Sequence, residues 1–186
     1  MADGGTERLF VAVALTEEAR AAIAAHLRAS LPGGVPGRVP PAANWHLTMR
    51  FLGAASRAER NTVRGALAAA DLGPAFDLVF GGLGAFPNPR RARVLWLGVD
   101  EGADRLRDLA ATAESAARSA GFAPEEKRFT PHLTLSRMQP ARPVADEVAR
   151  VPPLGLRMPV RELVIYRSHL GGGPARYEAV EHFALR

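Results

Sequence analysis

Cysteine is absent from the 186-residue sequence. That absence excludes disulfide bonds, thiol catalysis, zinc ribbons and iron–sulfur clusters, and it agrees with a reducing compartment. Lysine occurs once, at Lys127, so 23 of the 24 basic residues are arginine. Against 19 acidic residues this gives a formal net charge of +5. Because arginine grips phosphate with a planar fork, the excess favours an anionic partner such as nucleic acid, although compositional bias explains it equally well.

Long apolar runs are also missing. The early run Leu9–Leu15 is far shorter than the roughly 20 residues that a membrane helix needs. It follows the acidic residues Asp3 and Glu7 instead of a basic segment, so it does not resemble a signal peptide. Hydrophobic residues make up 47% of the chain and charged residues 23%, as in ordinary globular proteins. We therefore predict one two-lobed domain over residues 1–186, monomeric, cytoplasmic and without membrane attachment.

Hydrophobic periodicity predicts an α+β fold with about seven strands and three main helices. Strands are expected over Arg8–Leu15, Trp45–Leu52, Phe76–Leu83, Arg93–Val99, Phe129–Ser136, Arg161–His169 and Tyr177–Leu185. Helices are expected from an N-cap at Thr16 to about Ser30, from a Ser56–Glu59 capping box to near Gly73, and over Asp104–Ala120 with Gly121 behind it. The proline-rich segment Pro140–Gly155 is expected to be irregular, with room for one short helix.

One tetrapeptide occurs twice. His46-Leu47-Thr48-Met49 in the first half is repeated as His132-Leu133-Thr134-Leu135, 86 residues later and nearly half a chain length away. From the composition, roughly 0.04 copies of a His-apolar-Thr-apolar pattern would arise by chance. The pair therefore indicates a duplicated strand-and-helix unit, which predicts two pseudo-symmetric lobes.

Strand periodicity places the polar residues of both motifs on one face. Residues two apart on a strand share a face, so His46 and Thr48 point away from the core, as do His132 and Thr134. Two lobes related by a pseudo-twofold axis would bring both imidazoles and both hydroxyls to one cleft. Such a pair suits acid–base catalysis, with one neutral histidine accepting a proton and one protonated histidine donating it. Threonine hydroxyls can donate hydrogen bonds to phosphoryl oxygens.

The segments His46–Gly53 (HLTMRFLG) and Pro131–Arg137 (PHLTLSR) resemble the two-histidine phosphoesterase superfamily. Within it, the chain is similar to the bacterial and archaeal RNA 2′,3′-cyclic phosphodiesterases, also called 2′-5′ RNA ligases. The likeness includes the opening Arg8–Val13, the Phe86-Pro87 loop before Arg93–Gly98, and the closing Arg176-Tyr177 and Phe183–Leu185. The resemblance implies two α+β lobes with antiparallel sheets flanking a central cleft and helices on the outside.

The resemblance also implies the reaction and the site. RNA 2′,3′-cyclic phosphate ends would be hydrolysed to 2′-phosphomonoesters, with reversible 2′-5′ RNA ligation as a related activity. His46 would be the proton donor and His132 the proton acceptor, while Thr48, Thr134 and Arg137 would bind the phosphate. Strict alternation puts Arg137 on the wrong face, so a bulge or a strand end is required there. Arg50 shares the face of His46 and is the second electrostatic candidate.

No metal or other cofactor is predicted, because the sequence has no His-x-His or His-Glu-x-x-His pattern and no aspartate beside either motif. The expected partners are RNA with a 2′,3′-cyclic phosphate end, tRNA fragments among its candidates, and nucleotides. Two other functions stay open at this point. One is hydrolysis of a small cyclic nucleotide phosphate, and the other is RNA binding without turnover.

Overall fold

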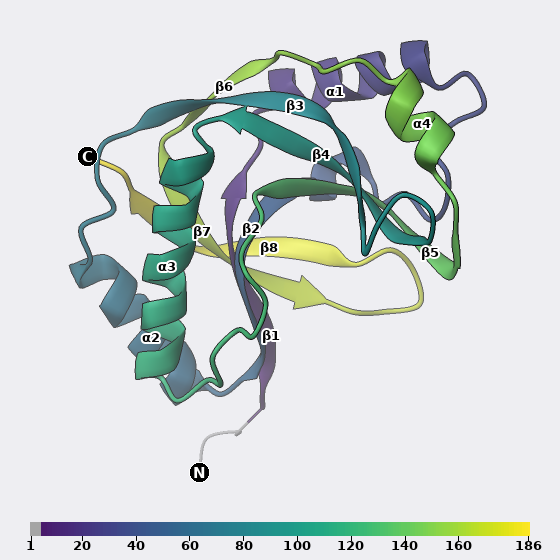
Figure 1. The fold of residues 1–186 in the computed structure, drawn as a ribbon. Helices are drawn as coiled ribbons and strands as arrows, with labels where there is room; N and C mark the ends of the chain where they lie inside the picture. Colours follow the sequence, from purple (N-terminus) through teal and green to yellow (C-terminus); the bar gives the residue numbers. More distant parts are fainter. Residues whose placement is uncertain (1–4) are drawn as a thin grey trace.

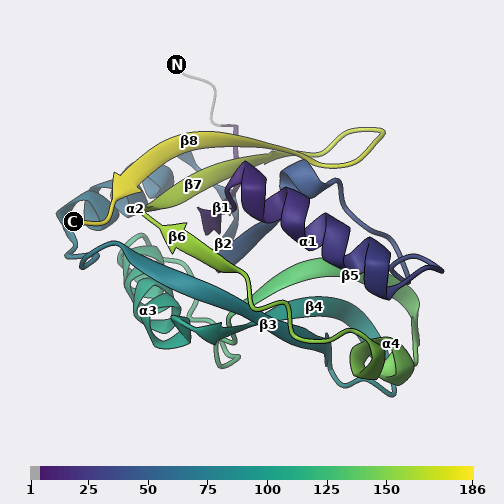
Figure 2. The ribbon, with the colours of Figure 1, turned by 90° about the horizontal axis from the view of Figure 1, so that it is seen from above.

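The computed structural model describes residues 5–186, so residues 1–4 of the predicted domain lie outside the described residues. It has one curled antiparallel sheet with helices on its outside (Figures 1 and 2). The strands are β1 (Glu7–Ala14), β2 (His46–Ala55), β3 (Phe76–Phe86), β4 (Ala92–Glu101), β5 (His132–Arg142), β6 (Arg157–Val160), β7 (Glu162–His169) and β8 (Arg176–Ala184). The helices are α1 (Glu17–Ser30), the 3₁₀ turn η1 (Ala42–Asn44), α2 (Arg57–Ala69), α3 (Ala103–Ser119) and α4 (Ala145–Arg150).

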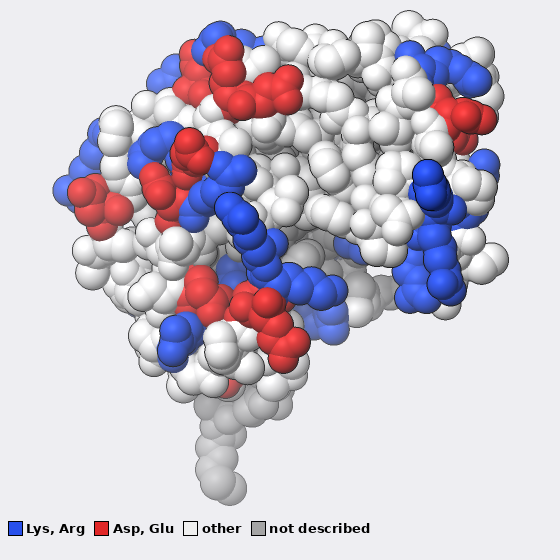
Figure 3. Space-filling model, in the orientation of Figure 1, with Lys and Arg blue, Asp and Glu red and all other residues white. Residues whose placement is uncertain are grey.

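The strand order β6-β3-β4-β5-β2-β1-β7-β8 puts the two histidine-bearing strands, β2 and β5, at the centre of the sheet. Four strands lie on each side of this centre, counting β5 with one half and β2 with the other. The two strands are antiparallel and meet at a single register pair, Leu47 with Leu133. The predicted antiparallel pseudo-symmetric lobes are confirmed, and this narrow contact joins their sheets into one. On the face seen in Figure 1, the space-filling view is hollowed near its middle (Figure 3).

The helices begin where the sequence predicts. The Thr16 side chain accepts a hydrogen bond from the backbone N–H of Ala19, 3.2 Å away, and so caps α1. Ser56 and Glu59 form the complete capping box of α2. Gly121 follows α3 with φ of 90°, a left-handed conformation that glycine adopts without steric cost. These local signals fix the helix ends independently of the rest of the fold.

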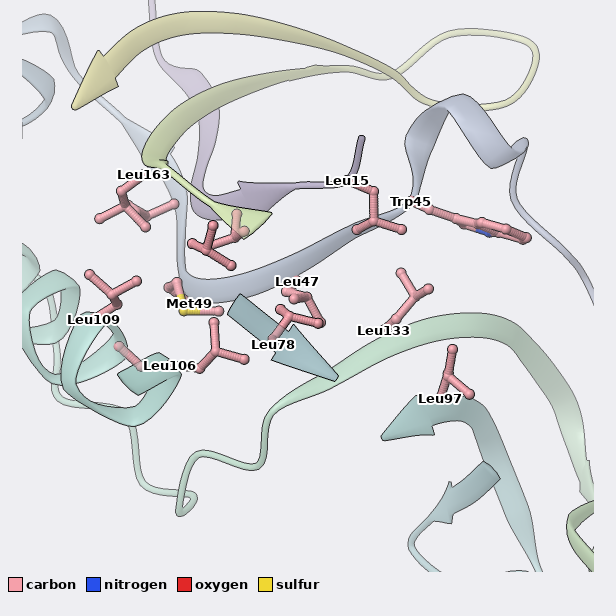
Figure 4. Packing of buried hydrophobic residues seen from close by; sticks show 14 of the residues in the cluster. Leu15, Trp45, Leu47, Met49, Leu78, Leu97, Leu106, Leu109, Leu133 and Leu163 are labelled. Atoms are coloured by element: carbon pink, nitrogen blue, oxygen red, sulfur yellow. The ribbon is translucent and has the colours of Figure 1, made fainter. Parts of the chain in front are cut away.

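The core lies between the sheet and the helices, and it contains the apolar half of each motif. Leu47, Met49 and Leu133 belong to the buried cluster that also contains Leu106 and Leu109 of α3; in Figure 4 Met49 lies toward α3, and Leu133 lies nearer to Trp45 and Leu97. Burying one such leucine side chain contributes about 1.5–3 kcal/mol. Because side chains alternate along a strand, anchoring these residues in the core turns His46 and His132 to the opposite face.

One strand was missed from the sequence. β6 lies immediately after the segment predicted to be irregular, and it pairs with β3 at the edge of the sheet. Its four residues include Pro159, which lowers the strand signal but is tolerated on an edge strand. The single short helix allowed for in Pro140–Gly155 is α4. Within residues 5–186, no helix combines the length and the apolar character needed to cross a membrane.

Candidate active site

Both histidines occupy the first position of their strands, on either side of the central contact. The burial pattern alternates along β2 and β5, with Leu47 and Leu133 fully buried and each neighbouring histidine and threonine only half-buried. His46, Thr48, His132 and Thr134 therefore share the open face of the sheet, as the strand period predicts. Within residues 5–186, the structure gives neither threonine hydroxyl a hydrogen-bond partner.

The tautomer of each imidazole is fixed by a backbone carbonyl two residues earlier. Nδ1 of His46 lies 2.7 Å from the carbonyl oxygen of Asn44, and Nδ1 of His132 lies 2.7 Å from that of Thr130. A carbonyl oxygen can only accept a hydrogen bond, so each Nδ1 must carry the proton. Each Nε2 is thereby left with a lone pair when the ring is neutral and with a proton to donate when it is charged. The same arrangement occurs in both lobes.

Aromatic side chains hold both rings from the sides. The ring of Phe10 lies 4.7 Å from that of His46, and Tyr177 meets the same imidazole edge-on at 5.3 Å. In the other lobe Phe86 meets His132 edge-on at 5.0 Å. These contacts restrict the orientation of both imidazoles and surround them with apolar surface. No local sequence pattern places these aromatic residues in the site.

Trp96 supports His132 from the neighbouring strand β4, with the two rings 6.1 Å apart. Its indole needs the glycine at position 84 on β3, since a Cβ there would lie 2.2 Å from the indole Cη2. That glycine therefore provides space for the wall behind the imidazole.

Burial lowers the pKa of both imidazoles. For His46, burial is the largest cause, the Asn44 carbonyl acts in the opposite direction, and repulsion from Arg137 and from a charged His132 adds to the lowering, so that the pKa is about 4. The pKa of His132 is lowered by burial and then by Arg137. Burial penalises the charged ring, and a nearby cation repels it. Both shifts favour the neutral imidazole at pH 7 in the unliganded protein.

We expect an anion in the cleft to raise both pKa values. A negative charge within about 4–6 Å of an imidazole favours its charged form by roughly one to three pKa units. The measurement is an NMR titration of the histidine ring signals with and without sulfate, which keeps its charge over the pH range. The ring signals of His26, which lies on α1 outside the cleft, serve as the control and should not respond. Unchanged pKa values of His46 and His132 at saturating sulfate would contradict this assignment.

A bulge in β5 brings Arg137 to the face of the histidines. On β4, Leu95 pairs with Ser136 while the next residue, Trp96, pairs with Thr134, so Leu135 has no partner opposite it. Leu135 and Ser136 are consequently both buried, and Arg137 is exposed on the cleft side. The expectation that Arg137 needs a bulge is confirmed.

The backbone of Arg137 is also held from outside the sheet. Its N–H and carbonyl form hydrogen bonds of 3.0 and 2.8 Å with the backbone of Arg38, in the loop after α1. Gly37 makes this close approach possible with φ of 88°, because a Cβ at that position would lie 2.7 Å from the Arg137 carbonyl oxygen. The strand that presents the arginine is therefore anchored on both sides.

Arg50 lines the same cleft, but its guanidinium is engaged by other protein groups. Its Nε lies 2.5 Å from Glu114 on α3, and its Nη1 lies 3.6 Å from Glu125. Nη2 donates to the carbonyl of Ala123 at 2.5 Å. These contacts tie β2 to α3 and to the segment that leads into β5, whose Thr130 carbonyl orients His132. The sequence placed Arg50 on the correct face but not in these ion pairs.

Replacing Arg50 by alanine should therefore destabilise the protein as well as slow the reaction. The side chain is only 9% exposed, and removing one partner of a buried ion pair typically costs about 3 kcal/mol. The midpoint of urea unfolding and the rate of phosphodiester hydrolysis should both fall, relative to a control Arg57→Ala on the exposed face of α2. A large loss of activity without any loss of stability would instead indicate that Arg50 contacts phosphate directly.

The cleft contains a cavity of about 870 Å³. Thr48, Arg50, His132, Thr134 and Arg137 line it, and His46 lies beside it, packed against Phe10. The structure thus brings together all six residues predicted from the sequence, five in the wall of the cavity and one next to it. Among the described residues, no three His, Cys, Asp or Glu side chains gather as a metal site would require.

Several known proteins are similar to this chain in sequence. The model of the 2′-5′ RNA ligase superfamily matches residues 11–172. The RNA 2′,3′-cyclic phosphodiesterase of Escherichia coli is 34% identical over 96% of this chain and 97% of its own length. The protein of that name from Aeropyrum pernix is 40% identical over 59% of this chain and 61% of its own length. The match to the Geobacillus stearothermophilus protein, at 32% identity, spans 95% of this chain and 56% of that protein.

Solved structures of such proteins have a similar fold. E. coli LigT complexed with 3′-AMP superimposes with a TM-score of 0.81 at 31% identity, covering 97% of this chain and 98% of the other. The NADP⁺ complex of the same protein gives 0.77 at 33% identity over the same shares. The chain belongs to the 2′-5′ RNA ligase superfamily. It is a phosphodiesterase, as its relatives are.

Proposed function

We propose that this enzyme opens 2′,3′-cyclic phosphate ends of RNA to 2′-phosphomonoesters, with His46 as proton donor and His132 as proton acceptor. The observation that carries the proposal is the pair of imidazoles on the central strands, each with Nδ1 bound to a carbonyl and Nε2 free. One free Nε2 on each side of a bound phosphorus atom suits an in-line displacement, in which the nucleophile enters opposite the leaving group. The relatives' names support the choice of substrate.

The reaction balances with these two groups. Nε2 of His132 takes a proton from water as the water oxygen forms a bond to phosphorus. The bond from phosphorus to the 3′ oxygen breaks, and that oxygen takes the proton from Nε2 of His46. Afterwards His46 is neutral and His132 charged, and exchange with solvent restores the starting state. Because the imidazoles are neutral without ligand, the phosphate anion itself favours protonation of His46 on binding.

The remaining polar groups stabilise the phosphate. The hydroxyls of Thr48 and Thr134 line the cavity and are free to donate to the phosphoryl oxygens, where negative charge accumulates. Arg137 supplies a positive charge at the same wall. If an RNA 5′-hydroxyl took the place of water, the same proton transfers would form a 2′-5′ linkage. Ligation is therefore the companion reaction of the same site.

A turnover assay tests the proposal directly. The purified protein, in excess EDTA, is given RNA with a 2′,3′-cyclic phosphate end, a cyclic mononucleotide phosphate, or a 5′-hydroxyl RNA together with the cyclic-ended RNA. We expect 2′-phosphomonoester formation from the RNA with EDTA present. Turnover confined to the mononucleotide would favour a small-molecule hydrolase, and binding without turnover would favour an RNA-binding module. Activity lost in EDTA and restored by one divalent ion would overturn the metal-independent mechanism.

The monomeric state and the cytoplasmic location stay predictions from the sequence.

A further inference from the structure

The cavity extends well beyond the residues that the terminal phosphate needs. From His132 and Thr134 it continues past Arg93 at the start of β4 and along α3 as far as Glu114. Its outer wall is the segment 125–130 between α3 and β5. A volume of about 870 Å³ is near the upper end of the range for small-molecule sites, so the cavity has room for more than a cyclic phosphate and its ribose.

The wall of this extension is positively charged. The cavity lining holds six cationic side chains and two carboxylates. Both carboxylates, Glu114 and Glu125, pair with Arg50, and the lining keeps a net charge of +4, six positive charges less two negative ones. Arg93, Lys127 and Arg128 are exposed, and within residues 5–186 none of them has a carboxylate partner. Figure 3 shows basic side chains on both sides of the hollow on this face. The surplus of positive charge is therefore available to an anionic ligand.

An exposed aromatic ring lies in the same cavity. Phe51, the residue after Arg50 on β2, is 54% exposed. Among the described residues, Val39 and Leu170 are the other large apolar side chains with comparable exposure, and neither lines the cavity. An exposed phenylalanine beside unpaired cations is the combination by which proteins hold single-stranded nucleic acid, with bases stacked on rings and phosphates on cations.

We propose that this extension is a binding groove for the single-stranded RNA that precedes the cyclic end. Lys127 and Arg128 contact backbone phosphates upstream of the terminal nucleotide, and Phe51 stacks on a base. The groove makes the enzyme prefer an end of a longer single strand over a cyclic mononucleotide. The inference rests on the proposed function for the identity of the terminal group. The groove residues themselves take no part in the proton transfers assigned to His46 and His132.

The double variant Lys127→Ala/Arg128→Ala tests the groove. The wild type should have a lower KM for a ten-nucleotide RNA than for a dinucleotide, both with cyclic ends. In the variant the KM for the ten-nucleotide RNA should rise roughly tenfold, and its dependence on log salt should flatten by about 1.4, since each phosphate contact with a single strand contributes about 0.7. The control Arg28→Ala/Arg57→Ala removes the same charge from exposed positions of α1 and α2 and should change neither quantity.

Phe51→Ala tests the stacking contact, with Leu170→Ala as the control for loss of an exposed apolar side chain. Base stacking on an aromatic ring contributes about 1–3 kcal/mol, so RNA affinity should fall roughly fivefold or more in the first variant only. Circular dichroism and thermal unfolding establish that each variant is folded. A wild-type KM independent of RNA length, or equal losses in the variants and their controls, would overturn the groove.

A binding measurement separates this inference from the proposed function. Fluorescence anisotropy of a ten-nucleotide RNA that ends in a 2′-phosphate reports on the groove without turnover. Binding that weakens in Lys127→Ala/Arg128→Ala, together with no hydrolysis of cyclic ends by the wild type, would support the groove and refute the proposed reaction. Hydrolysis with no effect of the variants on binding would support the reaction and refute the groove.

Discussion

Alanine in place of either His132 or His46 should lower kcat for cyclic phosphate hydrolysis by about 100- to 10,000-fold, the usual contribution of one general acid or base. In the proposed mechanism His132 accepts the proton of water and His46 donates a proton to the 3′ oxygen. Both rings are locked in the productive tautomer at 2.7 Å from a carbonyl, so truncation removes a prepositioned group. The measurement is kcat from initial rates on a dinucleotide with a cyclic end.

The double variant of His46 and His132 makes this test more specific. Removing both imidazoles should cost little more than removing one, because the two proton transfers belong to a single displacement. His182→Ala serves as the matched control, since that imidazole pairs with Glu162 at the far edge of the sheet, 3.2 Å away. Near-normal kcat in folded His46→Ala or His132→Ala protein would refute the two-histidine mechanism.

Much of this site could be predicted because its signals are local or repeated. The alternation of Leu47 and Leu133 with their polar neighbours follows from the pleat of a strand, so the face of each histidine is encoded in a few residues. The repeat then indicates that the halves are related, and the structure shows the two motifs meeting at the centre of one sheet. The helix starts at Thr16 and Ser56 are similarly local, because caps act over three residues.

The parts that could not be predicted depend on contacts far apart in the sequence. Alternation placed Arg50 on the cleft face, but its ion-pair partner Glu114 lies 64 residues further on, and nothing in the local pattern links them. The sequence indicates that a bulge is needed before Arg137. It does not give the position at Leu135, because that depends on how β5 pairs with β4. The packing of Phe10 and Tyr177 on His46 likewise joins strands from opposite ends of the chain. Tertiary pairing, more than composition, decides which polar residues remain free for substrate.

Replacing Arg137 should change both the rate of the reaction and the pKa values of the two histidines. Its guanidinium is exposed in the cavity wall, so Arg137→Gln removes the positive charge that, in the proposed reaction, faces the developing negative charge of the phosphate. Removing one such prepositioned group typically lowers kcat by about 100- to 1,000-fold. Arg161→Gln removes the same charge from an exposed site outside the cavity and should leave kcat unchanged. Arg137→Lys should recover part of the rate, because it restores the charge but not the planar fork.

The pH profile of the same variant gives an independent readout. Arg137 lowers the pKa of both His46 and His132 by repelling their charged forms. Without that repulsion both pKa values should rise, so the bell-shaped profile of kcat/KM should move as a whole toward higher pH. A residue that merely supports the fold would lower the rate without moving the profile, and that outcome would remove Arg137 from the electrostatics of the site. A profile displaced upward together with a fall in kcat would show that one side chain both stabilises the phosphate and helps to keep the two imidazoles neutral in the empty site.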